Sequence, residues 1–109
     1  MSTDPLGQVL GAVSDPTRRA ILDRLARGPA RVTDVAEPFA MSLNAISKHV
    51  KVLESAGLVR RIRQGREHNL ELNAAPLQDV SRWAYRYERF WNERLDRLET
   101  FFTDKRRKR

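Results

Sequence analysis

Cysteine is absent from the 109 residues of this chain. Its absence excludes a disulfide framework, a thiolate metal site and a cysteine nucleophile, and a small fold without disulfides is typical of a reducing cytoplasm. Long apolar runs are also missing, since no stretch approaches the roughly 18 consecutive apolar residues of a membrane-spanning helix. The N-terminus lacks the basic start and apolar run of a secretory signal. We therefore expect a cytoplasmic protein that is neither exported nor inserted into a membrane.

Glycine and proline are scarce, with five of each, while 40% of the residues are hydrophobic and 32% are charged. This composition argues against a disordered chain and favours a mostly helical globule with one core. Residues 1–104 are expected to form a single domain, and the five Lys and Arg residues 105–109 a disordered basic tail. The sequence contains no pocket motif with a paired acid and base, no nucleophile elbow and no phosphate-binding glycine loop, so we expect neither an enzyme nor a cofactor.

Positive charge is concentrated in two places. The net charge is +7, of which the last five residues supply +5, so residues 1–104 carry +2. Within them, residues 42–66 contain six Lys or Arg and one Glu, a local +5 that leaves −3 for the other 79 residues. A cationic segment in a slightly acidic domain suits a polyanion partner, because each neutralised phosphate releases condensed counterions. An ordinary solvated surface is the alternative.

Capping residues predict where the first two helices begin. Asp4-Pro5 and Asp15-Pro16 each combine an N-cap side chain with a proline at the first helical position. Gly28-Pro29 ends the second helix.

Two further helices are expected before residue 57. Thr33 is the predicted cap of a short third helix, which Pro38 distorts at its end. Ser42 is the predicted cap of a fourth helix that runs to about Ala56 and is closed by Gly57.

The periodicity changes after this fourth helix. Segments 58–63 and 67–72 alternate partly in polarity and are separated by Gln64-Gly65-Arg66, which predicts a β-hairpin. From Pro76 to about Thr103 the helical period returns and predicts a helix of about 27 residues, roughly 40 Å long. The expected fold class is mainly α with a small β-hairpin.

The fourth helix has two faces of different chemistry. At about 100° per residue, its apolar residues share one side and several polar residues lie nearly opposite. The apolar side consists of Ile46, Val50 and Leu53, and the polar side of Asn44, Ser47, Lys48 and Lys51. Asn pairs with adenine, and Lys with guanine or phosphate, so the polar side suits a DNA major groove. A short helix, a turn at residues 39–42, this helix and an Arg-flanked hairpin together predict a helix-turn-helix with a wing.

Three segments resemble the ArsR-type winged helix-turn-helix repressors. They are MSLNAISKHVKVLESAGLV (41–59), similar to the recognition helix and following strand, SDPTRRAIL (14–22), similar to an early helix, and RQGRE (63–67), similar to the wing. The resemblance covers most of residues 6–102. It implies a homodimeric, sequence-specific transcriptional repressor with a long C-terminal dimerisation helix. Its expected partner is duplex DNA with an inverted-repeat operator. The sequence names no small-molecule effector.

The resemblance also assigns residues to DNA contacts. Asn44, Ser47 and Lys48 fall at base-contacting positions, and the wing tip falls near phosphates or a minor groove. The full expected DNA-binding set is Ser42, Leu43, Asn44, Ser47, Lys48, His49, Lys51, Arg61, Arg63, Gln64 and Arg66. His49 lies between the two helix faces, so a packed role and a DNA contact are equal alternatives. His68 is expected to be a half-buried strand residue.

No metal site is expected. Metal-sensing members of the family carry cysteines on the helix that matches residues 33–40, or acids and histidines on the C-terminal helix. Here the first segment lacks Cys and His, and the last helix has acids but no histidine to complete a nitrogen-rich zinc site. Those acids, which we interpret as solvated partners of neighbouring arginines, are Asp79, Glu88, Glu93, Asp96 and Glu99.

The last helix contains seven of the eight aromatic residues. Apolar residues recur along it at alternating spacings of three and four, interrupted only by Arg94, and form a stripe wider than one small domain needs. A core-only role is the alternative to an interface with a second copy, in which this helix packs with the first. The expected interface residues are Leu6, Val9, Leu10, Val13, Trp83, Tyr87, Phe90, Trp91, Leu98 and Phe101.

Two other functions compete with DNA binding. Small basic proteins also bind structured RNA, but such modules usually place aromatics on an exposed platform, whereas here nearly all lie on the expected dimer helix. A winged helix can also serve as a protein-interaction module, which the basic wing disfavours without excluding it.

Overall fold

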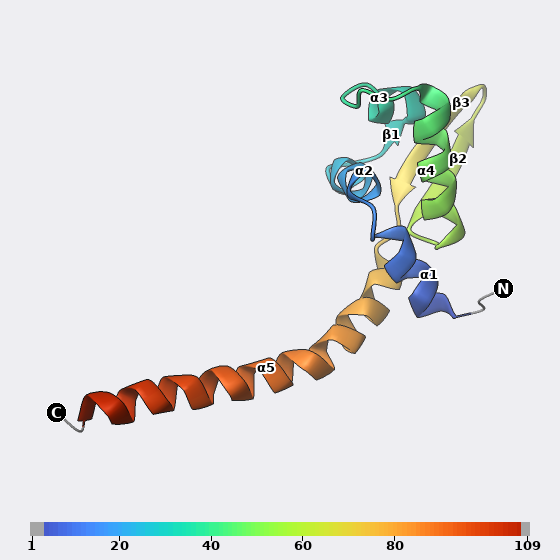
Figure 1. Cartoon of the computed structure of the whole chain (residues 1–109). Helices are drawn as coiled ribbons and strands as arrows, with labels where there is room; N and C mark the ends of the chain where they lie inside the picture. The colour runs from blue at the N-terminus through green and yellow to red at the C-terminus, as the bar shows by residue number, and fades with distance from the viewer. Residues whose placement is uncertain (1–3, 108–109) are drawn as a thin grey trace.

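A small helical domain carries one long helix that extends away from it in the computed structural model (Figure 1). The structure describes residues 4–107, and of residues 104–107 only the backbone. Helices and strands follow in the order α1, α2, β1, α3, α4, β2, β3 and α5. Among the described residues no helix is long and apolar enough to cross a membrane.

Helices α1 (Pro5–Ala12) and α2 (Pro16–Ala26) begin where their caps predict. The Asp4 carboxylate accepts a hydrogen bond from the Leu6 N–H at 3.1 Å, and the Asp15 carboxylate accepts one from the Arg18 N–H at 3.0 Å. Each bond satisfies a backbone donor that the first helical turn leaves without a partner.

The start of α3 (Val32–Ala36) differs from the prediction. Its N-cap is Arg31 and not Thr33, because β1 (Ala30–Arg31) holds the preceding backbone extended against β3. The helix ends before Pro38, and residues 37–42 connect it to α4, a longer link than the expected four-residue turn.

Helix α4 (Leu43–Ser55) has both predicted ends. The Ser42 hydroxyl accepts from the Ala45 N–H at 3.1 Å, which caps the start. At the other end Gly57 has a φ of 79°, and the N–H groups of Gly57 and Leu58 donate to the carbonyls of Glu54 and Leu53. This is the bond pattern of a Schellman motif, which needs a left-handed residue at Gly57.

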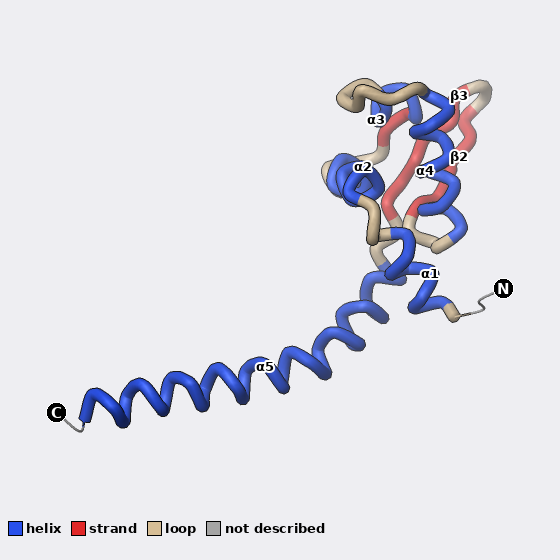
Figure 2. Tube along the Cα trace, in the orientation of Figure 1, coloured by secondary structure: helices blue, strands red, loops and turns tan. Residues whose placement is uncertain are grey.

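The predicted hairpin is present as β2 (Val59–Gln64) and β3 (Glu67–Leu72). Gln64 pairs with Glu67, so Gly65-Arg66 form a two-residue turn in which Gly65 adopts a φ of 63°. The antiparallel sheet has a third strand that the sequence analysis did not predict, because β1 pairs with β3 on the side away from β2 (Figure 2).

The core lies between α1, α2, α3, α4 and the base of the sheet. Its fully buried side chains are Ile21, Val35, Ile46, Val50, Leu53, Leu58 and Leu70. Helix α5 (Ala75–Arg107, 33 residues) packs its first turns on this core, where Leu77 and Val80 are partly buried. It continues through residues 105–107, where the sequence analysis expected a disordered tail, and Lys108 and Arg109 lie outside the described residues.

Candidate nucleic-acid interface

Helix α4 separates its two faces as its sequence pattern predicts. Ile46, Val50 and Leu53 are each 0% exposed and fix one side of the helix to the core. On the other side Asn44, Lys48 and Lys51 are exposed and Ser47 is half-buried, while Leu43 at the helix start is 48% exposed. The helix therefore presents hydrogen-bonding side chains on a rigid support.

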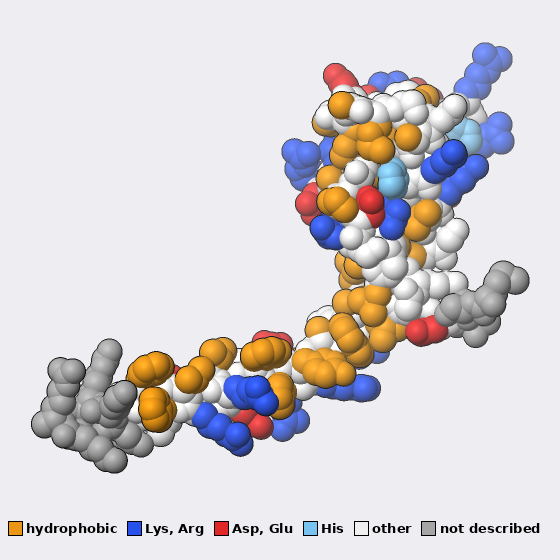
Figure 3. Space-filling view, in the orientation of Figure 1, with side chains coloured by type: hydrophobic (Ala, Val, Ile, Leu, Met, Phe, Trp, Pro, Cys, Tyr) orange, Lys and Arg blue, Asp and Glu red, His pale blue; other side chains and the backbone are white. Residues whose placement is uncertain are grey.

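The wing lies beside this polar face. A hollow of about 620 Å³ between α4 and the hairpin is lined by Ser47, Lys51, Glu54, Ser55, Arg61 and His68. His68 is exposed on β3, and not half-buried as expected, because this end of the hairpin extends beyond the core. At the tip the Arg63 guanidinium donates to the Gly65 carbonyl at 3.3 Å, and Arg66 occupies the turn. Lys and Arg side chains gather over this part of the surface (Figure 3).

Arg61 of the hairpin forms an ion pair with helix α4. Its Nη2 and Nε atoms lie 2.8 and 3.5 Å from the two carboxylate oxygens of Glu54 on α4, and both side chains are about one-third exposed. A two-point contact of this kind fixes the hairpin relative to the helix. Arg61 thus orients the wing as well as contributing charge.

His49 lies at the junction between α4 and the start of α2. Its Nδ1 atom is 3.3 Å from Arg18 Nη1 and 3.9 Å from Asp15 Oδ2, and its side chain is 21% exposed. The hydrogen bond from the Arg18 N–H, together with the nearby Arg18 guanidinium, lowers the pKa of Asp15 from its usual value. These contacts favour the packed alternative for His49, which keeps a small exposed edge.

The apolar stripe of α5 is uncovered within one chain. Every residue of 81–103 is exposed, including Trp83 at 39%, Tyr87 at 53% and Trp91 at 59%. Arg94 interrupts the stripe, yet its Cζ lies 4.4 Å from the ring centroid of Phe90, so its stem covers an aromatic face. Phe90, Leu98 and Phe101 are also about half exposed. The helix offers a long apolar face to another surface.

The expected α1 contribution to an interface needs one correction. Val9 is 3% exposed and belongs to the core of its own domain, so it is not available to a second copy. Leu6, Leu10 and Val13 are half-buried and keep accessible surface. The helical period predicted one continuous apolar stripe on α1. In the structure Val9 at the centre of this stripe is buried in the core, and the residues at its edges keep accessible surface.

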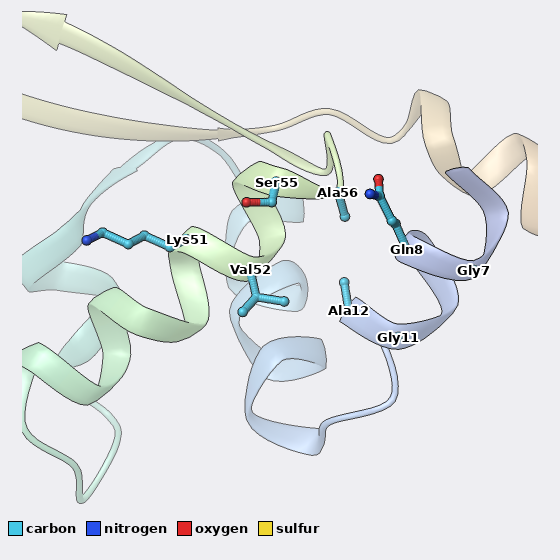
Figure 4. Close-up of a pocket in the computed structure, with 8 residues that line it drawn as sticks. All are labelled: Gly7, Gln8, Gly11, Ala12, Lys51, Val52, Ser55 and Ala56. Carbon is cyan, nitrogen blue, oxygen red and sulfur yellow. The ribbon is translucent and has the colours of Figure 1, made fainter. Parts of the chain in front are cut away.

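A second hollow, of about 380 Å³, separates α1 from the C-terminal half of α4 (Figure 4). Small residues line most of it: Gly7, Gly11 and Ala12 from α1, and Ser55 and the C-cap residue Ala56 at the end of α4. The two helices are therefore not closely packed along this side.

Comparison with known proteins identifies the family. A helix-turn-helix domain model matches residues 13–62. The transcriptional repressor SdpR of Bacillus subtilis is 40% identical over 78 residues, an alignment that covers 72% of this chain and 87% of SdpR. The crystal structure of an ArsR family transcriptional regulator has a TM-score of 0.75 and 38% identity, and covers 82% of this chain and 98% of that one. This chain belongs to the ArsR family. The winged helix-turn-helix fold and the family that the sequence analysis expected are both confirmed.

The assembly of a possible ArsR-family regulator is also described. The solution structure of Mb0332 from Mycobacterium bovis, a homodimeric winged helix-turn-helix DNA-binding domain, is 29% identical with a TM-score of 0.62. It covers 84% of this chain and 82% of that one. Assignment of individual residues of the present ArsR protein to DNA or dimer contacts stays a prediction.

Two side-chain contacts of the site were not predicted from the sequence. Glu54 was expected only as a lone acid in a basic segment, and Arg18 only as part of a family motif, although each contacts a predicted DNA-binding residue. Both contacts join segments that the fold brings together, so local periodicity carries no signal for them. Among the described residues no group of three or more His, Cys, Asp or Glu side chains could hold a metal ion.

Proposed function

We propose that this ArsR-family chain is a homodimeric transcriptional repressor that binds duplex DNA through the polar face of α4 and through the wing. The observation that carries the proposal is the position of Asn44, Lys48 and Lys51, exposed on α4 beside the arginine-bearing hairpin. The buried opposite face of the same helix holds these groups in place. A bound repressor blocks access to a promoter.

Base recognition is assigned to the N-terminal half of α4. In helix-turn-helix proteins this part of the recognition helix enters the major groove. Asn44 would pair with adenine, Lys48 with guanine acceptors, and Ser47 with a base edge or the backbone. Ser42 and Leu43 lie at the helix start, where Leu43 presents an apolar side chain suited to a thymine methyl group.

The backbone contacts are assigned to the positive groups around the hollow and at the tip of the hairpin. Lys51 and Arg61 line the hollow beside α4, and Arg63, Gln64 and Arg66 lie at the end of the wing. Phosphate contacts of this kind position a protein on DNA without selecting a sequence.

A second copy is the proposed occupant of the α5 stripe. The helix exposes aromatic side chains along most of its length, which is costly in water. The homodimeric state of the related M. bovis domain supports the same assembly here. A twofold dimer places two recognition helices in successive major grooves, so its operator would be an inverted repeat with half-sites about one helical turn, or a small multiple, apart.

The first experiment selects bound fragments from a genomic library, and compares retention of duplex DNA, structured RNA and a protein lysate at matched salt. Recovery of an inverted-repeat duplex is the expected result. Preferential retention of RNA, or of one protein partner with no duplex DNA, would contradict the proposal.

The second experiment separates base recognition from backbone contact. Asn44→Ala should weaken the binding free energy for the selected operator by roughly 1 to 3 kcal/mol and that for random DNA by much less. Arg66→Ala should instead weaken binding to both and reduce the salt slope by about one for each phosphate that is no longer neutralised, a number that doubles in the dimer. Equal reductions in affinity for operator and random DNA in Asn44→Ala would show that α4 does not recognise bases.

A further inference from the structure

The guanidinium group of Arg18 lies where α1, α2 and α4 meet. Its Nε donates to the Ala12 carbonyl at 2.6 Å and its Nη2 donates to the Gly11 carbonyl at 3.1 Å. Its Nη1 lies 3.3 Å from His49 Nδ1 on α4. Each of the three nitrogens has its own partner, two on α1 and one on the proposed recognition helix.

The chemistry at the end of α1 suits this group. The last carbonyls of a helix have no intrahelical donors, and the C-terminal end of a helix favours positive charge. Arg18 meets both requirements, and its own backbone N–H is held by the Asp15 carboxylate at 3.0 Å. Because the guanidinium spreads its donors over three nitrogens of a planar fork, a lysine, whose donors share one nitrogen, could not reach all three partners at once.

His49 couples this group to the DNA-facing surface. An imidazole Nδ1 accepts a hydrogen bond only when it carries no proton, so the contact requires the neutral ring with its proton on Nε2. His49 follows Lys48, which is exposed on the polar face, and precedes the fully buried Val50. Because these residues share one helix, a shift of the helix backbone at His49 would also move the side chains proposed to contact bases.

Packing between α1 and α4 is incomplete on one side. The hollow lined by Gly7, Gly11 and Ala56 separates the two helices along the C-terminal half of α4 (Figure 4). The contacts of Arg18 with α1 and with His49 therefore add to the core packing of Val9 and Ala12 in setting the angle between the two helices.

We propose that Arg18 and His49 form a positioning pair that fixes the orientation of the recognition helix relative to α1. This inference rests on the proposed function, in which α1 and α5 lie at the dimer interface. In that dimer the pair would set the separation between the two recognition helices, and so the half-site spacing that the protein accepts.

Matched variants are available on both elements. Arg18→Lys keeps the charge and removes the fork. Its control is Arg19→Lys, since Arg19 lies on the same helix and donates to the Val13 carbonyl at 2.7 Å at the same corner. His49→Leu removes the acceptor, and His49→Gln keeps one. If Arg18→Lys fails to fold, the two His49 variants carry the test.

The main readout is preference for half-site spacing, measured on the selected operator and on versions with one base pair added to or removed from the spacer. The wild type should bind the selected spacing about tenfold or more tightly than the altered ones. In Arg18→Lys and His49→Leu this affinity ratio should fall to about threefold or less, a change in the range of coupling between contacting residues. Arg19→Lys and His49→Gln should keep the preference, and the Arg18→Lys, His49→Leu double variant should be no worse than either single one. General destabilisation would weaken binding to all spacers alike.

A DNA-free readout separates this inference from the proposed function. The ring nitrogen resonances of His49 should show an unprotonated Nδ1 that shifts in Arg18→Lys and not in Arg19→Lys. Any of three results would overturn the positioning role. They are equal spacing profiles for Arg18→Lys and Arg19→Lys, effects that multiply in the double variant, and an Nδ1 resonance that is unchanged in Arg18→Lys. A wild type that retains no duplex DNA would refute the proposed function, and the nitrogen resonance would then decide whether the pair exists.

Discussion

Replacing Trp91 with alanine should dissociate the proposed dimer, and the size of the effect follows from the exposed surface. Trp91 is 59% exposed in the single chain and lies at the middle of the α5 stripe. A tryptophan buries up to about 250 Å², so truncation to alanine removes roughly 100 Å² of coverable apolar surface per copy. At about 25 cal/mol/Å², this is roughly 2.5 kcal/mol per copy and about 5 kcal/mol per dimer.

That figure is an upper estimate, because an interface covers only part of each side chain. If half of the surface is covered, about 2.5 kcal/mol remains, and the dimer dissociation constant rises roughly sixtyfold. Sedimentation equilibrium over a range of protein concentrations measures this constant directly. The wild type should be a dimer at micromolar concentration, and Trp91→Ala should be largely monomeric there.

Tyr85 provides the matched control. It is an aromatic residue on the same helix with the same 59% exposure, but the helical period places it on the polar side, away from the stripe. Tyr85→Ala should therefore leave the dissociation constant nearly unchanged. Equal effects of the two substitutions, or a wild type that is monomeric well above micromolar concentration, would refute the interface.

Three further predictions concern single sites. Ser42→Ala removes the side-chain acceptor 3.1 Å from the Ala45 N–H and should lower the free energy of unfolding by about 1 kcal/mol, measured by urea denaturation. The folded-state pKa of Asp15 lies below its ordinary 3.8, so its carboxylate stabilises the fold above that pH and loses this effect as the pH falls through the lowered pKa. The difference in free energy of unfolding between wild type and Asp15→Asn should therefore be constant near neutral pH and shrink only under acid conditions. Zinc, cadmium or arsenite at low micromolar concentration should leave operator affinity unchanged, since the chain has no cysteine and its two histidines lie on different elements; a decrease in affinity suppressed by His68→Gln would contradict this.

Local chemistry explains which parts of the fold were predictable. The ends of α1, α2 and α4 follow from Asp4, Asp15, Ser42 and Gly57, whose caps act on backbone groups a few residues away. The start of α3 follows instead from the pairing of Ala30 with Leu70, a contact between distant parts of the chain. A capping rule applied at Thr33 could not anticipate that strand.

The same distinction applies to the candidate site. The polar face of α4 is visible in the sequence because burial of Ile46 and Val50 determines where the opposite side points. His49 falls at the boundary of the two faces, so the period alone left its role open. The contact partner of His49 is Arg18, which lies 31 residues earlier in the sequence, and only the packing of α1 and α2 against α4 brings the two side chains together.

The helix α5 combines both kinds of information. The apolar stripe is a local pattern, so the sequence predicts that the helix has an apolar face. The surface that covers this face lies elsewhere, and no local pattern identifies it. Leu77 and Val80 rest on the core, whereas residues 81–103 extend into solvent. Most helical stability in proteins comes from packing one apolar face against another surface. In the proposed assembly the second copy supplies that burial, so dimerisation stabilises the part of α5 that leaves the core. The half-site spacing on DNA then depends on an interface that neither copy can form alone.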